Sequence, residues 1–332
     1  MASASSRLIA VTTLAAVVAA LGVATSSSAA IAISSRERTV VIDELSMSEA
    51  VCVETSDLQP FLPGSNVKHC GAPSTSVPVP AGWTLVWGDE FNGDSIDRSK
   101  WNVLNNSTYG DGNSELACLM DGPQNVRVSA GALTISAQAE ASLKCGISDA
   151  RFPGGRSFSS GHLQTKGKAS FEYGRFEICA KTPIAHGSSK GMWPAFWLRP
   201  TDGGIGELDV FESMGSGAEE RDSSNRTEQT IHYDYVRTYP KQNKNYTLPL
   251  GTFADGYHDY ALEWEPGVIR WYVDGIMTYE RTRATTPWID EAFSRPFYLR
   301  LNLAVGGPVG TPTTATDFPA NFIIDHVRVY QR

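Results

Sequence analysis

The sequence has little positive charge and no long basic run. The 332 residues carry a formal net charge of −8, and the pI is about 5.3. Proteins that bind nucleic acid or anionic membrane surfaces cluster lysine and arginine on one face. We therefore expect neither nucleic acid nor a membrane surface as a partner.

Long hydrophobic runs are also missing, except at the N-terminus. There Arg7 precedes an apolar run from residue 8 to 23, and small residues follow it at positions 25–30. This order is typical of a secretory signal peptide, with cleavage after Ala30 or Ala32. A membrane anchor is the alternative, but the run is short for a bilayer span. We predict that residues 1–32 are a signal peptide and that the mature protein is secreted, extracellular and free of the membrane.

Cysteine is scarce, with five residues in the whole chain. Export would permit disulfide bonds. One pairing that fits the spacing joins Cys52 to Cys70 and Cys118 to Cys145, and it leaves Cys179 unpaired. Spacing does not determine connectivity, so this pairing is one of several.

Helical periodicity is absent from the second part of the chain. Residues 71–82 are rich in proline, serine and glycine, which is typical of a linker. Beyond them, short alternating runs such as 169–178 and 260–264 are separated by turn residues, with hairpin signals at Pro266-Gly267 and Asp274-Gly275. We predict an N-terminal extension and linker over 33–82. Residues 83–332 are predicted to form one all-β domain, an antiparallel two-sheet sandwich.

The most informative stretch is residues 206–213, which places three carboxylates within six residues. Alternation with Leu208 and Val210 predicts a strand whose acidic face carries Glu207 and Asp209. Strict alternation would turn Glu212 into the core, where an ionised carboxylate costs several kcal/mol. One extra residue at Val210–Phe211, a β-bulge, would return Glu212 to the acidic face. Three carboxylates on one face can serve as general acid, general base and nucleophile. The alternative interpretation is an edge strand whose acidic face is solvated and has no catalytic role.

Two further strands indicate which face a ligand would use. Residues 193–199 place Trp193 and Trp197 on one face, and residues 297–303 place Arg300 and Asn302 on one face. Aromatic planes beside hydrogen-bonding groups suit sugars, whose C–H faces stack on rings while their hydroxyls need partners. The alternative is that the tryptophans belong to the core.

From residue 83 to 332 the chain resembles the family-16 glycoside hydrolases, which include laminarinases, lichenases, agarases and κ-carrageenases. Seven segments in order carry the resemblance: 87–91 (WGDEF), 173–177 (YGRFE), 191–197 (GMWPAFW), 206–212 (GELDVFE), 272–275 (YVDG), 301–307 (LNLAVGG) and 325–330 (DHVRVY).

The resemblance implies a β-jelly-roll sandwich and a catalytic trio. It implies Glu207 as nucleophile, Asp209 as its electrostatic helper and Glu212 as general acid/base. The spacing is similar to the bulged, laminarinase-type branch rather than the bulgeless lichenase branch. Carried over by position, the substrate-binding residues are Trp193, Trp197, Asn113, His232, Arg300 and Asn302.

The resemblance also implies a structural calcium site, although no cofactor is expected to be required. The matching positions are Glu90, Gly131 and Asp325. Asp325 could equally be a solvated strand residue, and His232 could equally be a structural histidine.

Two departures from the family pattern weaken the inference of laminarin specificity. His162 and Cys179 stand where laminarinases often carry arginines, which we interpret as two arginines lost from the cleft. Arg300 could compensate for them, or could favour an anionic or modified glycan. We expect a monomeric endo-β-glycanase with β-1,3-glucan as its polysaccharide partner. The alternatives are another glycan, such as a galactan or mixed-linkage glucan, a transglycosylase, or a glycan-binding protein without catalysis.

Overall fold

The computed structural model describes residues 38–41, 51–54, 81–234 and 241–332. The chain divides into two units, Met1–Val67 and Lys68–Arg332. Within the first unit, β1 (Arg38–Val41) pairs with β2 (Val51–Glu54) in antiparallel fashion. The predicted signal peptide, most of the predicted linker and a Cys52–Cys70 disulfide lie outside the described residues and side chains.

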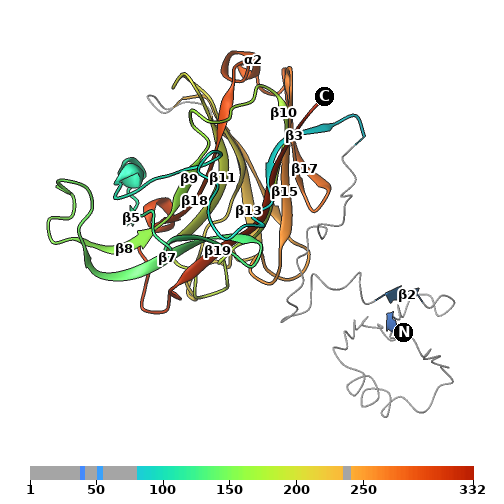
Figure 1. Ribbon diagram of the computed structural model, residues 1–332. Coiled ribbons are helices and arrows are strands. Elements are labelled where there is room, and N and C mark those ends of the chain that lie inside the picture. Colours follow the sequence, from blue (N-terminus) through green and yellow to red (C-terminus); the bar gives the residue numbers. More distant parts are fainter. Residues whose placement is uncertain (1–37, 42–50, 55–80, 235–240) are drawn as a thin grey trace, which may run out of the picture. The chain divides into compact units, whose positions relative to one another are not determined.

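The second unit is a sandwich of two sheets, as the alternating sequence predicts (Figure 1). One sheet has seven strands and will be called the acidic sheet. In spatial order it consists of β14 (Lys241–Thr247), β13 (Arg226–His232), β12 (Glu207–Glu212), β11 (Met192–Pro200), β18 (Phe297–Val305), β9 (His162–Gln164) and β4 (Asn102–Val103).

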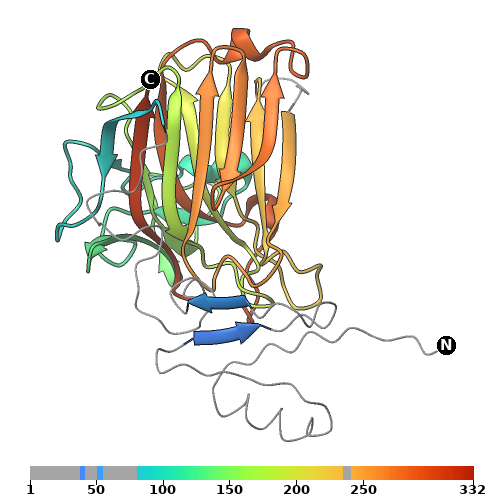
Figure 2. The same cartoon turned by 90° about the vertical axis from the view of Figure 1, so that its right-hand side faces the viewer.

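The other sheet has ten strands and will be called the opposite sheet. Its main path is β17 (Ile276–Thr282), β16 (Val268–Val273), β15 (His258–Glu265), β10 (Gly174–Lys181), β19 (Ala320–Gln331), β7 (Ala132–Leu143), β8 (Arg156–Ser160) and β5 (Ala117–Leu119). In addition, β3 (Thr84–Asp89) pairs with β19, and β6 (Val126–Ser129) pairs with β7. Figure 2 shows β19 beside β10, although 138 residues lie between the two strands in the sequence.

Strand pairing is antiparallel throughout the described residues except between β5 and β8. In the described residues, helical structure is limited to α2 (Ile289–Ala292) and the 3₁₀ turns η2 (Tyr109–Asn113) and η3 (Gly307–Val309). Within the described part of the chain, no helix is long and apolar enough to cross a membrane.

The core forms where the apolar faces of the two sheets meet. In β18 the odd-numbered residues Leu299, Leu301 and Leu303 are fully buried, and in β10 Phe176 and Ile178 are fully buried. Alternation along each strand sends these side chains inward and the intervening ones outward. The outward faces of β11, β12 and β18 are therefore free to carry a site.

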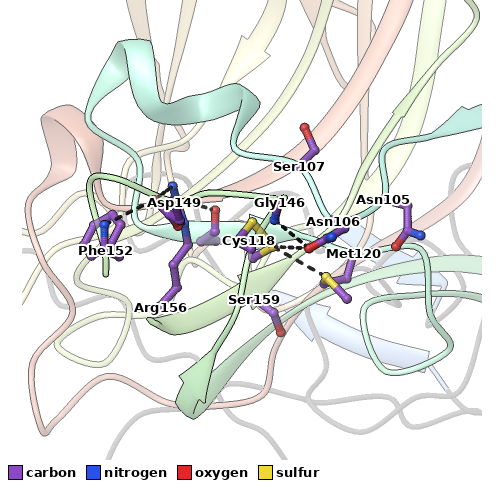
Figure 3. The surroundings of a disulfide bond; sticks show 12 residues. Asn105, Asn106, Ser107, Cys118, Met120, Gly146, Asp149, Phe152, Arg156 and Ser159 are labelled. Atoms are coloured by element: carbon purple, nitrogen blue, oxygen red, sulfur yellow. Dashed lines mark hydrogen bonds and ion pairs between the residues drawn. A yellow bond between two sulfur atoms is a disulfide. The ribbon is translucent and has the colours of Figure 1, made fainter. Parts of the chain in front are cut away.

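A disulfide joins Cys118 of β5 to Cys145 in the loop after β7, as predicted (Figure 3). Cys179 is also disulfide-bonded. Its partner lies outside the described side chains, so the prediction that Cys179 stays unpaired is wrong. The sequence could not show this, because spacing alone does not reveal which cysteines meet in space.

Candidate active site

The predicted β-bulge is present in β12. On one side Phe211 lies opposite Phe196, while Asp209 lies opposite Trp197, so Val210 is the extra residue. The register with β13 shifts at the same place, between Asp209 and Glu212. Val210 and Phe211 are fully buried. The bulge therefore resolves the conflict in the sequence, and the three acids share the outward face.

The facing sheet supports the bulge through the core. Trp271 of β16 is fully buried, and its Nε1–H donates to the backbone carbonyl of Asp209 at 2.8 Å. A buried carbonyl needs such a partner. Phe211 stacks on Tyr260 of β15, with ring centroids 4.0 Å apart. Both contacts fix the backbone from which the acids project.

Cationic and polar side chains from neighbouring strands surround Glu207 and Asp209. Nη1 of Arg199 lies 3.4 Å from Glu207 Oε2. Nε2 of His232 lies 3.7 Å from Glu207 Oε1 and 3.2 Å from Asp209 Oδ2. His232 lies with the acids because it is directly opposite Glu207 in the register, and its role in substrate binding stays a prediction.

The electrostatics differ along the trio. Burial, and then the charges of Glu207 and Glu228, raise the pKa of Asp209 well above its usual value. Burial, and then the charges of Asp209 and Glu207, raise the pKa of Glu212 well above its usual value. Burial lowers the pKa of His232, against the pull of the carboxylates. The arrangement favours the protonated form of Glu212 and the neutral form of the His232 imidazole beside the other two acids.

Two tryptophans lie on the same face as the acids, as predicted. Trp193 Nε1–H donates to Glu212 Oε1 at 2.9 Å, and Trp197 Nε1–H donates to Asn302 Oδ1 at 2.6 Å. Both rings are partly exposed, and neither belongs to the buried core. Asn113 is exposed and lines a pocket of about 440 Å³ together with Trp193 and Gly307. The pocket therefore lies next to the Glu212 end of the acidic face, since Trp193 both lines the pocket and contacts Glu212.

Arg300 lies beside these groups, under a ring that the sequence did not single out. Its guanidinium carbon is 4.1 Å from the Trp197 ring centroid and 4.3 Å from that of Tyr109. Nε donates to His162 Nε2 at 3.1 Å, and Nη1 donates to the Tyr109 hydroxyl at 2.5 Å. Arg300 therefore occupies the same part of the sheet as His162, which supports the idea that it compensates there.

The interpretation of Cys179 as a second cleft position is wrong. Cys179 belongs to β10 of the opposite sheet, and its side chain lies on the face that carries Arg175 and Glu177 rather than with the core residues. Of the two positions that depart from the family pattern, only His162 lies in the acidic sheet.

Sequence reasoning missed Tyr109 and underrated Arg199. Alternation along residues 193–199 placed Arg199 on the outward face, but no motif marked it as a partner of Glu207. Tyr109 lies in η2, a short turn without strand periodicity, and only the fold brings it against Arg300.

The fold brings the three predicted calcium positions together. The pairing of β19 with β7 ends at Ile324, and its pairing with β3 begins at Val327. Gly131 immediately precedes β7, and Glu90 immediately follows β3. Both segments therefore reach the part of β19 between its two pairings, which contains Asp325. Arg328 donates to the carboxylate of Glu90 from Nε at 2.7 Å and from Nη2 at 2.8 Å. Asp325 Oδ2 lies 3.1 Å from His326 Nδ1. Backbone carbonyls with one carboxylate are suitable calcium ligands, so the set fits the ion.

Two other groups of described side chains could hold a metal ion by distance alone. Glu207, Asp209 and His232 offer ligand atoms within 4.8 Å of one another, at the acidic face itself. The second group is Cys179, Asp325 and His326. Its sulfur is disulfide-bonded and therefore is not a thiolate ligand.

Comparison with known proteins agrees with this geometry. A model of the family described as "Glycosyl hydrolases family 16" matches residues 113–321, well over half of the chain. The glucan endo-1,3-beta-glucosidase A1 of Niallia circulans is 38% identical over 283 residues, and the alignment covers 76% of this chain and 39% of that protein. The beta-glucanase of Rhodothermus marinus is 35% identical, with 75% of this chain and 85% of that protein covered.

A solved structure shares the fold. The laminarinase catalytic domain from Thermotoga maritima MSB8 superposes with a TM-score of 0.63 at 32% identity, and it covers 75% of this chain and 98% of its own. The family match, the identities and the shared jelly-roll sandwich lead to one conclusion: the chain belongs to the glycosyl hydrolases of family 16.

Proposed function

We propose that this protein is a secreted endo-β-1,3-glucanase that hydrolyses its substrate with retention of configuration. The observation that carries the proposal is the outward acidic face of the bulged strand β12. It presents Glu207 beside Arg199 and His232, and it presents Glu212, whose pKa is raised by burial and which accepts a hydrogen bond from Trp193. The relatives whose names specify endo-1,3-β-glucanase activity support the choice of substrate.

Two different roles follow from the environments of the two glutamates. In the first step an oxygen of Glu207 attacks the anomeric carbon, the glycosidic bond breaks, and the Glu212 proton passes to the leaving oxygen. In the second step Glu212 takes a proton from water, whose oxygen attacks the anomeric carbon and releases Glu207. A retaining pair works at a carboxyl separation of about 5–5.5 Å.

Asp209 and His232 support the nucleophile from either side. Asp209 lies between the two glutamates on the bulged strand, and burial raises its pKa, which favours its protonated form. It can therefore donate a hydrogen bond to Glu207 without adding a third negative charge. Neutral His232, 3.7 Å from Glu207, can orient the same carboxylate.

A structural calcium ion and export remain parts of the proposal. The backbone carbonyls of Glu90 and Gly131 with the Asp325 carboxylate would hold the ion, away from the acidic sheet. The N-terminal apolar run supports export, and the Cys118–Cys145 disulfide is compatible with an oxidising compartment.

The test is incubation with defined glycans, namely laminarin, lichenan, agarose, carrageenan and xyloglucan, followed by product sizing. We expect laminarin to be cut internally into a ladder of oligosaccharides. Cleavage of a galactan with laminarin untouched would contradict the substrate assignment and leave the mechanism standing. Transfer of glucosyl units to added acceptor sugars in place of hydrolysis would indicate a transglycosylase.

A further inference from the structure

Arg300 is the most unusual residue of the acidic sheet, because it is a buried cation without a direct anionic partner. Only 2% of the residue is exposed. Among the described residues, its hydrogen bonds go to a neutral imidazole, His162, and to the phenol of Tyr109. No carboxylate oxygen of the described part of the chain lies within 4.0 Å of its nitrogen atoms.

Such a cation is costly unless something offsets its desolvation. The rings of Trp197 and Tyr109 offset part of this cost, since each lies within cation–π distance. The buried carboxyl of Glu115 is an acid that senses the charge from further away. Burial raises the pKa of Glu115 to about 7, despite a hydrogen bond from Asn113 and the charge of Arg300. Near neutral pH Glu115 is therefore only partly ionised and neutralises Arg300 incompletely.

One nitrogen of the guanidinium is available to a ligand. Nε and Nη1 are occupied by His162 and Tyr109, whereas Nη2 donates to none of the described residues. Nη2 is also not among the unpartnered side-chain atoms that are closed off from solvent. The small exposed part of Arg300 thus includes a charged donor, framed by two aromatic rings, of which Tyr109 is 52% exposed.

The position along the sheet fits a sugar unit beyond the one attacked. Trp197 lies opposite Asp209 on one side and opposite Arg300 on the other. Since neighbouring strands are about 4.8 Å apart, Arg300 lies roughly 10 Å from the catalytic strand. A glucan bound across the strands would reach it without moving the scissile bond away from the acids.

We propose that Arg300 determines specificity by binding an anionic substituent, a carboxylate or a sulfate ester, on the glucan unit that stacks against Tyr109 and Trp197. The inference rests on the proposed glucanase function and refines its substrate class. A neutral hydroxyl would need only a neutral donor at this place, whereas an anionic oxygen forms a charge-assisted bond with the guanidinium that is roughly twice as strong.

The experiment compares three matched substrates: neutral β-1,3-glucan, the same glucan partly oxidised at C6 to the carboxylate, and the same glucan partly sulfated at O6. Rates are measured for the wild type, Arg300→Met and Arg300→Lys. We expect Arg300→Met to lower kcat/KM about 10–100-fold on at least one anionic glucan and less than about threefold on the neutral one. Arg300→Lys should retain part of the preference, since it keeps the charge and loses the planar fork.

Arg281→Met is the matched control, because Arg281 also lies over a tyrosine ring and donates to its hydroxyl, but on β17 of the opposite sheet. It should leave the rates on all three substrates unchanged. Raising the salt concentration should lower kcat/KM of the wild type on the anionic glucan and should not do so for Arg300→Met. A loss of packing in Arg300→Met would not by itself produce this difference in salt dependence between the wild type and the variant. The carboxylate and sulfate arms show which anion is bound.

Equal losses of Arg300→Met on neutral and anionic glucans would overturn the proposal and assign Arg300 to ring orientation. Hydrolysis of neutral glucan with rejection of both anionic forms by the wild type would also overturn it, while the proposed function would stand. If the wild type cuts none of the three, the proposed function fails and the inference fails with it.

Discussion

At the scale of single residues, the site assigns different tasks to chemically similar acids. Glu207 has a guanidinium and an imidazole beside it, whereas Glu212 has a neutral indole N–H and two nearby acids. These surroundings support the proposal that Glu212 is the group that holds a proton and that Glu207 is the nucleophile. The distinction cannot come from sequence position, because both are glutamates on one strand.

Replacing the two glutamates separately should therefore give different defects. Glu207→Ala should abolish turnover on every substrate, because no glycosyl-enzyme can form. Glu212→Ala should slow the cleavage of a natural glycan by about 10²–10⁴-fold, yet largely preserve the first step on an aryl glycoside whose leaving group needs little protonation. Steady-state and burst kinetics on both substrates measure this difference.

Azide provides the control for the two roles. It needs no base, so it should enter the space left by Glu212→Ala and restore turnover with a β-glycosyl azide as product. Rescue of Glu207→Ala to an α-azide, with Glu212→Ala inactive, would show that the roles are reversed. Circular dichroism of both variants excludes misfolding as the cause.

Trp197 should matter more for substrate than for folding. Its ring is partly exposed, and it contacts Arg300 and Asn302 on the outward face. Trp197→Ala should raise KM and lower kcat/KM with little change in melting temperature. Loss of a core tryptophan would instead cost about 3–5 kcal/mol of stability. Thermal melting beside kinetics decides the matter, and a large drop in melting temperature with unchanged kinetics would place Trp197 functionally in the core.

At the scale of elements, β12 shows what alternation can predict. The sequence alone required a bulge at Val210–Phe211, because a regular strand would have buried Glu212, and the register shift lies at that place. The sequence could not reveal that Trp271, from the facing sheet, would support the bulge. Alternation gives the face of a residue on its own strand, but not the partners that the other sheet supplies.

Segments without the alternating pattern of a strand, and the assignment of strands to sheets, were harder to predict. Tyr109 lies in a turn, and its contact with Arg300 spans 191 residues of sequence. Cys179 was assigned to the cleft by analogy of position, whereas its strand belongs to the opposite sheet. Local pattern identifies strands and their faces well, but assigning a strand to one of two sheets requires long-range pairing that pattern does not contain.

The loop between β7 and β8 is joined to β5 by the Cys118–Cys145 disulfide. In Figure 3 the disulfide lies near Arg156 and Asp149, whose side chains are 2.6 Å apart. Arg156 also donates to Asp111 of η2 at 2.8 Å, so the loop is joined to the turn that carries Tyr109 and Asn113. Loss of the bond should therefore affect the acidic face as well as stability.

The double variant Cys118→Ala/Cys145→Ala should lose roughly 3–4 kcal/mol of unfolding free energy, because the bond closes a loop with a sequence separation of 27 residues. Chemical denaturation measures the loss, and kinetics below the melting transition should show a raised KM. Arg156→Met, with the disulfide intact, separates the ionic from the covalent contribution. Peptide mapping of the wild type that finds Cys145 joined to another cysteine would refute this account.

At the scale of the whole molecule, several carboxyls bind protons more tightly in the folded chain than in the unfolded one. Burial raises the pKa of Glu115 to about 7, and burial followed by the charge of Glu177 raises that of Asp259 to about 7. Asp209 and Glu212 shift in the same direction. Through these carboxyls the native state holds more protons between about pH 4 and 7, so their contribution to the free energy of unfolding falls as pH rises through that range.

Opposite shifts limit stability on the acid side. Burial, and then the charge of Arg300, lower the pKa of His162 well below its usual value. Burial also lowers the pKa of His232, so the stability that these neutral rings contribute is lost as pH falls below about 6.5. Glu177, whose pKa is lowered by His326 and Arg175 against its burial, adds a loss at more acidic pH. The two sets of groups together place maximal stability at mildly acidic pH.

Melting temperature measured from pH 4 to 9 should therefore peak at about pH 5–6 and decline toward pH 8. Glu115→Gln, in the segment between η2 and β5, and Asp259→Asn, in β15, remove one titrating group each, and each should make the decline up to about pH 7 shallower. The charged groups that act on Glu115 and on Asp259 are different ones, so the two effects should add in the double variant. Glu219→Gln, at an exposed glutamate, is the control and should leave the slope unchanged. A melting temperature that rises steadily to pH 8, or variants whose slopes match the wild type, would show that these carboxyls are ionised in the folded protein without cost.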